Sequence, residues 1–295
     1  AAGGLRATAS FAIPEALTSI TIKHEGKNTA LSSLRVAGGS TTELTATGWY
    51  YGNKVYSADT SFTWSVSDAL GTIDEDGTFT AVQTGRDVTG TLTVTYGETS
   101  CTLPVTVGSS QPFDDTKGHW AESYITELYY AGTLQGSEKN GKLYYRPDAS
   151  MTRQEFIVAM MRYLGTDLSA YASVQLPFDD SGSIASWAKS AMQAAYQLGY
   201  LTGSKTNGKL LAKPGSTISR QEAMTILSRT KDFADADLNV LSAFSDSGKI
   251  ADWARTALAQ MTQQKIISGS KGKLNPTGKV TRAEVAKMLY MLSET

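Results

Sequence analysis

Thr152-Arg153-Gln154-Glu155 stands directly before an apolar run, and the pattern returns as Ser219-Arg220-Gln221-Glu222 and as Thr281-Arg282-Ala283-Glu284. Each copy has the Ser/Thr-x-x-Glu spacing of a capping box, in which the hydroxyl and the carboxylate bond free backbone N–H groups at the start of a helix. We therefore predict three helices that begin at these tetrapeptides and belong to three copies of one structural unit.

An arginine occupies the first helical position in all three copies: Arg153, Arg220 and Arg282. A cation lies at the unfavourable end of the helix dipole there, at a cost of ~0.3–1 kcal/mol. Free N–H groups at a helix start already favour anions, so an arginine placed there three times predicts three anion sites. The alternative interpretation is that the arginines are solvated surface residues.

The composition is ordinary for a soluble globular protein, with 295 residues, 41% of them hydrophobic and 19% charged. At ~150 residues per domain, this length has room for about two domains. The net charge of −1 argues against a large nucleic-acid-binding surface. No apolar run approaches the ~20 residues of a membrane helix, and the N-terminus has no signal-peptide pattern. Cys101 is the single cysteine, and we expect it to be a small buried apolar residue.

The first part of the chain, residues 1–108, alternates between polar and apolar residues and lacks helical periodicity. The alternating runs are residues 18–22, 62–66, 91–96 and 103–107, separated by Gly, Asn and Asp. Several short strands with turns between them predict an all-β sandwich. The acidic segment 74–77 lacks the glutamate that a calcium-binding EF-hand needs at its twelfth position, so we predict a tight turn there.

The order of features over residues 14–107 resembles the bacterial Ig-like domain, group 2. The resemblance rests on Trp64-Ser65-Val66, on residues 76–81 (Asp-Gly-Thr-Phe-Thr-Ala) and on Val105-Thr106-Val107. It implies an Ig-like β-sandwich of the kind that serves as a spacer or an adhesion module on bacterial surfaces. Residues 109–112 then form a short linker.

Three tandem repeats fill the rest of the chain, at residues 113–176, 177–242 and 243–295. Each repeat carries Phe-x-Asp, a tryptophan, a Gly-Ser pair, a proline and the Ser/Thr-Arg-x-Glu motif, with only the loop before the proline varying in length. Fixed spacings around one variable loop indicate a repeated unit. The periodicity predicts helix, loop and helix, so we expect the three repeats to pack together into an all-α assembly.

These landmarks resemble those of the surface-layer homology (SLH) domain in three tandem copies. The resemblance implies an all-α, pseudo-threefold SLH trimer with three grooves between neighbouring repeats. In this family the grooves bind secondary cell-wall polysaccharide, often with a pyruvyl ketal on N-acetylmannosamine, and the motif arginine contacts it. That contact agrees with the predicted anion sites, because the ketal carries a carboxylate. Gln154 and Gln221 stand where the family usually has alanine.

The candidate ligand-binding residues come from the same repeated positions. Besides the arginines they are Trp120, Trp187, Trp253, Asp115, Asp180, Asp246, Gly136, Gly203, Gly269, Ser137, Ser204 and Ser270. For the tryptophans we favour packing in the core, with stacking on a sugar as the alternative. For the aspartates we favour capping of the first helix or of the turn before it, with bonds to sugar hydroxyls as the alternative. The Gly-Ser pairs end the first helix, at a loop whose N–H groups we expect to donate to ligand.

The function expected from this reasoning is a non-catalytic cell-surface anchor, secreted and attached to the bacterial cell wall or S-layer. Its expected partner is pyruvylated wall polysaccharide, with other surface-layer proteins as an option, and we expect no nucleic acid, membrane insertion, metal or cofactor. The alternatives are a self-assembling S-layer lattice protein and a fragment of a surface enzyme whose catalytic domain is missing here. Adjacent carboxylates such as Asp114 and Asp115 need not face one substrate, whereas a glycosidase pair must flank one bond at a defined separation.

Overall fold

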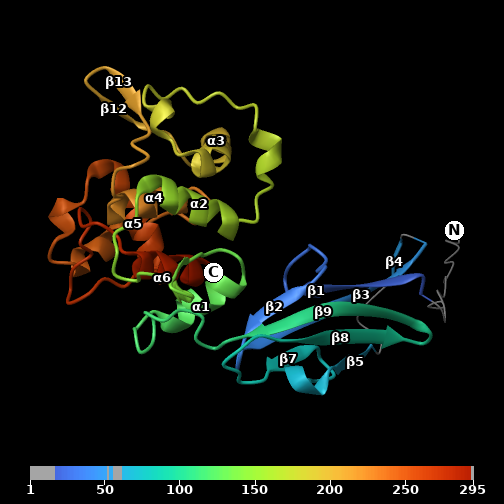
Figure 1. The fold of residues 1–295 in the computed structure, drawn as a ribbon. Helices are drawn as coiled ribbons and strands as arrows, with labels where there is room; N and C mark the ends of the chain where they lie inside the picture. The colour runs from blue at the N-terminus through green and yellow to red at the C-terminus, as the bar shows by residue number, and fades with distance from the viewer. Residues whose placement is uncertain (1–16, 52, 56–61, 294–295) are drawn as a thin grey trace, which may run out of the picture. The chain divides into compact units, whose positions relative to one another are not determined.

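The computed structural model describes residues 17–51, 53–55 and 62–293, and the chain divides into two compact units, residues 1–112 and 113–295 (Figure 1). Within this described part, no helix combines the length and the apolar character that crossing a membrane requires.

The first unit is built of strands. They are β1 (Ser19–His24), β2 (Leu34–Ala37), β3 (Thr41–Tyr50), β4 (Asn53–Val55), β5 (Thr63–Val66), β6 (Gly71–Ile73), β7 (Thr78–Ala81), β8 (Val88–Tyr96) and β9 (Thr99–Gly108), with a 3-10 turn η1 (Asp68–Leu70). One sheet has the order β1-β3-β7-β6, with β4 paired to β3, and the other has the order β2-β9-β8-β5. The pairs are antiparallel except for β2 with β9, which run parallel.

Side chains from both sheets meet in one core. Ile22 and Leu44 of the first sheet, and Leu92, Val94 and Val105 of the second, are each at most 2% exposed. Along β8 and β9 these apolar residues alternate with more exposed threonines, the period of strands with one face buried. All four predicted strand runs therefore lie in or overlap strands, while the resemblance to the Ig-like domain stays a prediction.

Two local predictions in this unit concern the acidic turn and the cysteine. The carboxylate of Asp74 accepts hydrogen bonds from the backbone N–H groups of Asp76 (3.1 Å) and Thr78 (2.7 Å), and Gly77 has a φ of +89°, so the predicted tight turn is confirmed. Cys101 is half-buried and packs against the core, where burial raises the pKa of its thiol.

The second unit mixes helices with small hairpins. Its α-helices are α1 (Glu122–Tyr130), α2 (Arg153–Tyr163), α3 (Lys189–Gln197), α4 (Arg220–Ser228), α5 (Asp252–Gln263) and α6 (Arg282–Ser293). Its strands are β10 (Ser137–Lys139), β11 (Lys142–Tyr144), β12 (Ser204–Thr206) and β13 (Lys209–Leu211). Its 3-10 helices are η2 (Leu168–Tyr171), η3 (Ser181–Ser183), η4 (Ser186–Ala188), η5 (Leu238–Ala243) and η6 (Ser247–Lys249).

The prediction of an all-α trimer for this unit is therefore wrong. The loop of the first repeat forms the hairpin β10–β11 and that of the second forms β12–β13, which projects from the helices in Figure 1. In the third repeat, whose loop is shorter, only the single bridge between Ser270 and Lys273 remains. Turn residues at positive φ, Asn140-Gly141 and Asn207-Gly208, favour hairpins over helix at these positions.

The three repeats share one core and contact one another in a closed order. The second helix of each repeat packs against the first helix of the next, as α2 on α3, α4 on α5 and α6 on α1. Residues such as Phe156, Leu227 and Leu289 are fully buried in this common core. Two short helices bury too little apolar surface alone, so each repeat depends on its neighbours.

Candidate ligand-binding grooves

The three predicted helix starts are confirmed as capping boxes. At the start of α2, the backbone N–H of Thr152 donates to Glu155 Oε2 at 2.7 Å, and the threonine Oγ1 accepts from the backbone N–H of Glu155. The same reciprocal arrangement occurs at Ser219 and at Thr281. Because each box uses its own glutamate, the carboxylate lies fixed beside the first turn of its helix.

The N–H groups at these helix starts are already occupied, which corrects the expectation that they bind an anion. The backbone N–H of Arg153 donates to Ser216 O (2.9 Å), that of Arg220 to Gly278 O (2.8 Å), and that of Arg282 to Ala149 O (2.9 Å). In each case the acceptor belongs to the proline-led loop of the next repeat, with the third repeat returning to the first. The helix starts thus join the repeats into a closed ring.

Two of the motif arginines form ion pairs across this ring. Arg153 bonds Glu222 and Arg220 bonds Glu284 (2.7 Å), so each guanidinium meets the capping-box carboxylate of the next repeat. Both arginine side chains are only 12% exposed. Burial lowers the pKa of Arg220, against the opposing effect of Glu284. Burial by itself would raise the pKa of Glu222, but hydrogen bonds from Ser219 and the charge of Arg153 outweigh it and hold that pKa below its ordinary value.

The third motif arginine is placed differently. Arg282 donates to the backbone carbonyls of Tyr145 (2.7 Å) and Gln135 (2.8 Å), and its guanidinium lies 4.5 Å from the centre of the Tyr145 ring. The Tyr145 hydroxyl donates back to Arg282 O at 3.0 Å, and burial raises the pKa of this phenol, which keeps it a donor. In the described part of the chain, no arginine pairs with Glu155, the remaining capping-box carboxylate.

The tryptophans are not core residues, so the favoured interpretation of them is wrong. Trp120, Trp187 and Trp253 are 56%, 58% and 58% exposed. Helices α1 and α3 begin after their tryptophans, so the regular helical face starts later than the spacing predicts. In α5 the tryptophan lies in the first turn and still points outward. The alternative interpretation, stacking on a sugar, remains a prediction.

The aspartates do not cap the first helices. Each carboxylate instead accepts two backbone N–H groups from the residues just before the loop proline, Asp115 from Tyr145 (2.8 Å) and Arg146 (2.7 Å), and Asp180 from Ala212 (2.8 Å). The remaining bonds repeat this pattern: Lys213 N–H to Asp180, and Leu274 and Asn275 N–H to Asp246. The carboxylates therefore fix the chain that leads into the proline loop, and the alternative of bonds to sugar hydroxyls stays a prediction.

The glycines of the Gly-Ser pairs allow close packing. A Cβ at Gly203 would lie 2.6 Å from the ring of Phe178, and one at Gly269 would lie 2.8 Å from the ring of Phe244. Gly136 faces Phe113 in the same way. Gly203 and Gly269 also have positive φ values of +72° and +67°. The phenylalanine of each Phe-x-Asp landmark thus requires a glycine at this position. Helices α1, α3 and α5 end at Tyr130, Gln197 and Gln263, so the prediction that the Gly-Ser pairs end the first helix is wrong.

Two grooves bring the predicted positions together from all three repeats. Groove 1, of about 290 Å³, is lined by Arg153, Leu201, Thr202, Gly203, Ser204, Glu222, Thr225, Ile226, Arg229 and Trp253. Groove 2, of about 690 Å³, is lined by Trp120, Arg220, Ile266, Ile267, Ser268, Gly269, Ser270, Lys271, Lys273, Leu274, Asn275, Glu284, Lys287 and Met288. In each, one repeat gives the arginine, the next gives the Gly-Ser pair and the glutamate, and the third gives the tryptophan.

At the remaining junction, between the third and the first repeat, the residues that correspond to those of grooves 1 and 2 are Arg282, Gly136, Ser137 and Trp187. Ser137 lies on β10 and is exposed, while Arg282 already bonds the carbonyl next to this Gly-Ser pair, at Gln135. The structure therefore distinguishes this junction from the other two by the partners of its arginine.

Sequence reasoning missed the groove residues that do not repeat. Arg229 in groove 1 and Lys287 in groove 2 are cations without equivalents in every repeat. It named Gln154 but missed its contact: the side-chain carbonyl of Gln154 accepts from the backbone N–H of Ala185 at 3.0 Å in the next repeat. Gln221 does the same for Ala251, so both glutamines join repeats. The departure from the family's usual alanine was the available signal.

A model of the S-layer homology domain matches residues 112–157, 177–224 and 243–286. Three tandem S-layer homology domains are therefore present in the second unit. Such domains are anchoring modules rather than catalytic ones, and they indicate a cell-wall or S-layer location at the cell surface.

Similar proteins are much longer than this chain. The amylopullulanase of Thermoanaerobacterium thermosulfurigenes is 28% identical over 68% of this chain and 10% of its own length. The exoglucanase XynX of Acetivibrio thermocellus is 28% identical over 79% of this chain and 21% of its own. The surface-layer 125 kDa protein of Lysinibacillus sphaericus is 32% identical over 61% of this chain and 15% of its own. The chain thus spans between 10% and 21% of the length of these relatives.

Proposed function

Because the chain contains three tandem S-layer homology domains, we propose that it is a non-catalytic anchor that holds a protein on the cell surface by binding an acidic secondary cell-wall polysaccharide. The polysaccharide would lie in grooves 1 and 2, between the repeats.

One observation carries this proposal: the exposed tryptophan, the motif arginine and the Gly-Ser pair meet in each groove, although they come from three different repeats. An exposed aromatic ring beside polar groups suits a sugar, whose apolar face stacks on the ring while its hydroxyls bond the polar groups. Stacking on a sugar would also explain why the tryptophan rings are exposed and not packed in the core.

The charge of the grooves favours an acidic sugar. Groove 2 has one acidic side chain in its lining, Glu284, against Arg220 and three lysines. Groove 1 has Glu222 against Arg153 and Arg229. A pyruvyl ketal on N-acetylmannosamine, the ligand that the SLH resemblance implies, would supply a carboxylate for this excess of positive charge. A charge-assisted hydrogen bond contributes about 1.5–3 kcal/mol.

A single contact of that size gives weak binding, and a wall anchor must hold for long times. Two or more grooves that engage one polymer raise the overall affinity by ~10²–10⁴ over a single groove. We therefore expect that loss of the tryptophan from one groove, by Trp253→Ala or Trp120→Ala, weakens wall binding and that the double variant abolishes it. Retained sedimentation of the folded double variant with walls would contradict binding in the grooves.

The testing experiment is co-sedimentation of the chain with purified cell-wall sacculi, either native or stripped of pyruvyl groups by mild acid. The proposal expects binding to native walls and a large loss of binding to stripped walls. Equal binding to both would mean that the polymer is recognised through neutral sugar faces. Absence of binding to either would contradict the anchor function itself.

The similarity to a surface-layer protein favours a second candidate, assembly into an S-layer lattice. Electron microscopy of the purified chain without wall material separates the two functions, because a lattice protein forms ordered sheets on its own and an anchor stays dispersed. For the first unit we propose a spacer role between the anchor and whatever the complete protein carries.

A further inference from the structure

We propose that Arg229, rather than the motif arginine Arg153, supplies the positive charge that recognises an anionic group in groove 1. This inference rests on the proposed function, because it names the residue of that groove that reads the acidic sugar.

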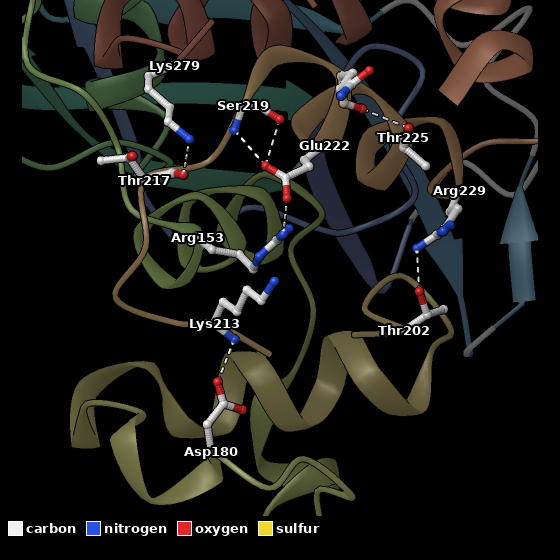
Figure 2. A network of polar contacts seen from close by, with 11 residues as sticks. Arg153, Asp180, Thr202, Lys213, Thr217, Ser219, Glu222, Thr225, Arg229 and Lys279 are labelled. Carbon is white, nitrogen blue, oxygen red and sulfur yellow. Dashed lines mark hydrogen bonds and ion pairs between the residues drawn. The ribbon is translucent and has the colours of Figure 1, made fainter. Parts of the chain in front are cut away.

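Arg153 is already neutralised within the protein. Its guanidinium bonds Glu222, whose carboxylate also accepts hydrogen bonds from the backbone N–H (2.8 Å) and the hydroxyl (2.6 Å) of Ser219 (Figure 2). The pKa of Glu222 is held below its ordinary value, so the carboxylate is ionised at neutral pH. An anionic ligand that approached Arg153 would therefore meet the negative charge of Glu222 at the same place.

Arg229 has neutral partners instead. It lies at the end of α4, and its Nη1 donates to the backbone carbonyl of Tyr200 at 2.7 Å. The same Nη1 donates to the hydroxyl of Thr202 at 3.4 Å (Figure 2). Across the described residues, no carboxylate comes within ion-pair distance of it. A guanidinium has five N–H donors in a planar fork, so Nη2 and Nε remain to bind a carboxylate in the two-pronged geometry.

The surroundings of Arg229 point to an absent anion. Desolvation lowers the pKa of its guanidinium, so the cation has lost water without gaining a counter-charge. Ser204 also lines groove 1, and its hydroxyl is enclosed without a hydrogen-bond partner in the described structure. The carboxylate of a ligand in groove 1 would supply the counter-charge that Arg229 lacks.

The competing explanation is structural. A cation at the C-terminus of a helix is favoured by the helix dipole, and Arg229 also ties α4 to the loop at Tyr200–Thr202. Such a role would lower the stability of the fold on substitution without a specific effect on the charge preference of groove 1. The experiment therefore has to separate the two grooves within one molecule.

The tryptophans make this separation possible, because Trp253 lines groove 1 and Trp120 lines groove 2. The chain is labelled with 5-fluorotryptophan, its five tryptophan resonances are assigned, and it is titrated with the pyruvyl ketal of methyl N-acetylmannosaminide, followed by fluorine NMR. The titration is repeated with Arg229→Gln, with Arg229→Lys, and with Lys209→Gln as a control that removes an exposed cation of the same repeat outside the groove.

The expected result is a loss of affinity of about tenfold or more at Trp253 in Arg229→Gln, from the charge-assisted bond that is removed, with an unchanged titration at Trp120. Arg229→Lys keeps part of the affinity, and Lys209→Gln titrates as the wild type does. The methyl ester of the probe binds groove 1 of the wild type about as weakly as the acid binds Arg229→Gln.

Two results would overturn the inference: an unchanged titration at Trp253 in Arg229→Gln, or an equal loss at both tryptophans, which would show a structural role. A wild-type chain in which neither tryptophan responds to the probe would instead contradict the proposed function.

Discussion

Replacing the capping-box glutamate by glutamine in each repeat isolates the ion pairs that cross the ring. Glutamine keeps the capping-box geometry and removes only the charge. Glu222 and Glu284 each pair with an arginine, whereas Glu155 has only its own box partners among the described residues, so Glu155→Gln is the matched control.

The expected magnitudes follow from burial. Glu155→Gln loses a negative charge at a helix start, which contributes ~0.3–1 kcal/mol. Glu222→Gln loses this and also leaves Arg153, with a side chain only 12% exposed, without its counter-charge. Removal of one partner of a fully buried pair costs about 3–5 kcal/mol, and the 29% exposure of the Glu222 side chain reduces this. We therefore expect Glu222→Gln to destabilise by about 2–3 kcal/mol, against about 1 kcal/mol or less for Glu155→Gln.

The assay is urea unfolding of the whole chain followed by circular dichroism at 222 nm, because the α-helices of the described structure all lie in the second unit. The folded state holds the pKa of Glu222 below its ordinary value near 4.5, so the stabilisation is full above that pH and is lost as the pH falls through the folded-state pKa. The difference between wild type and Glu222→Gln should shrink accordingly in acid. Equal destabilisation by Glu155→Gln and Glu222→Gln would refute the role assigned to the ion pair.

Three further predictions concern the scaffold and the groove. Gly203→Ala should destabilise by about 1–3 kcal/mol in urea unfolding, because the new Cβ meets the Phe178 ring at 2.6 Å and φ is +72°, while Gly208→Ala, with open space around it and a similar φ, should show only the smaller backbone strain. Asp246→Asn should destabilise by about 1–3 kcal/mol at pH 7, since the carboxylate accepts from two N–H groups. Burial alone would raise the pKa of Asp246, but these bonds lower it, so the difference in stability between wild type and Asp246→Asn should shrink in urea unfolding at acid pH. Trp253→Ala should weaken wall co-sedimentation with little change in stability, because the ring is 58% exposed; a large drop in stability would show that the ring packs after all.

Local signals predicted the helix starts of the second unit well. The capping boxes depend on residues three positions apart, and the structure has all three of them. The Phe-x-Asp and Gly-Ser landmarks recur for a physical reason that spacing does not reveal, since each glycine lies against the phenylalanine ring of its own repeat. Repetition in the sequence therefore identified residues that the fold requires, but it did not identify what they contact.

The errors arose where partners are distant in sequence. The N–H groups at the helix starts looked free because their acceptors, the loop carbonyls of the next repeat, lie far along the chain. The hairpins have strands of three residues, which are too short to show alternation. The tryptophan spacing matched a helical face, but α1 and α3 start after the tryptophan, so exposure could not be read from periodicity.

The closure of the ring governs when this unit can finish folding. Arg282 bonds Tyr145, which lies 137 residues earlier in the sequence. The backbone N–H of Arg282, at the helix start of the third repeat, also donates to Ala149 O in the loop of the first repeat. Contacts of such long sequence separation form late, because the intervening chain must be ordered first. During synthesis or export, the first two repeats emerge with the acceptors of the first loop still unpaired. The second unit therefore cannot complete the hydrogen bonds between its third and first repeats until α6 has emerged.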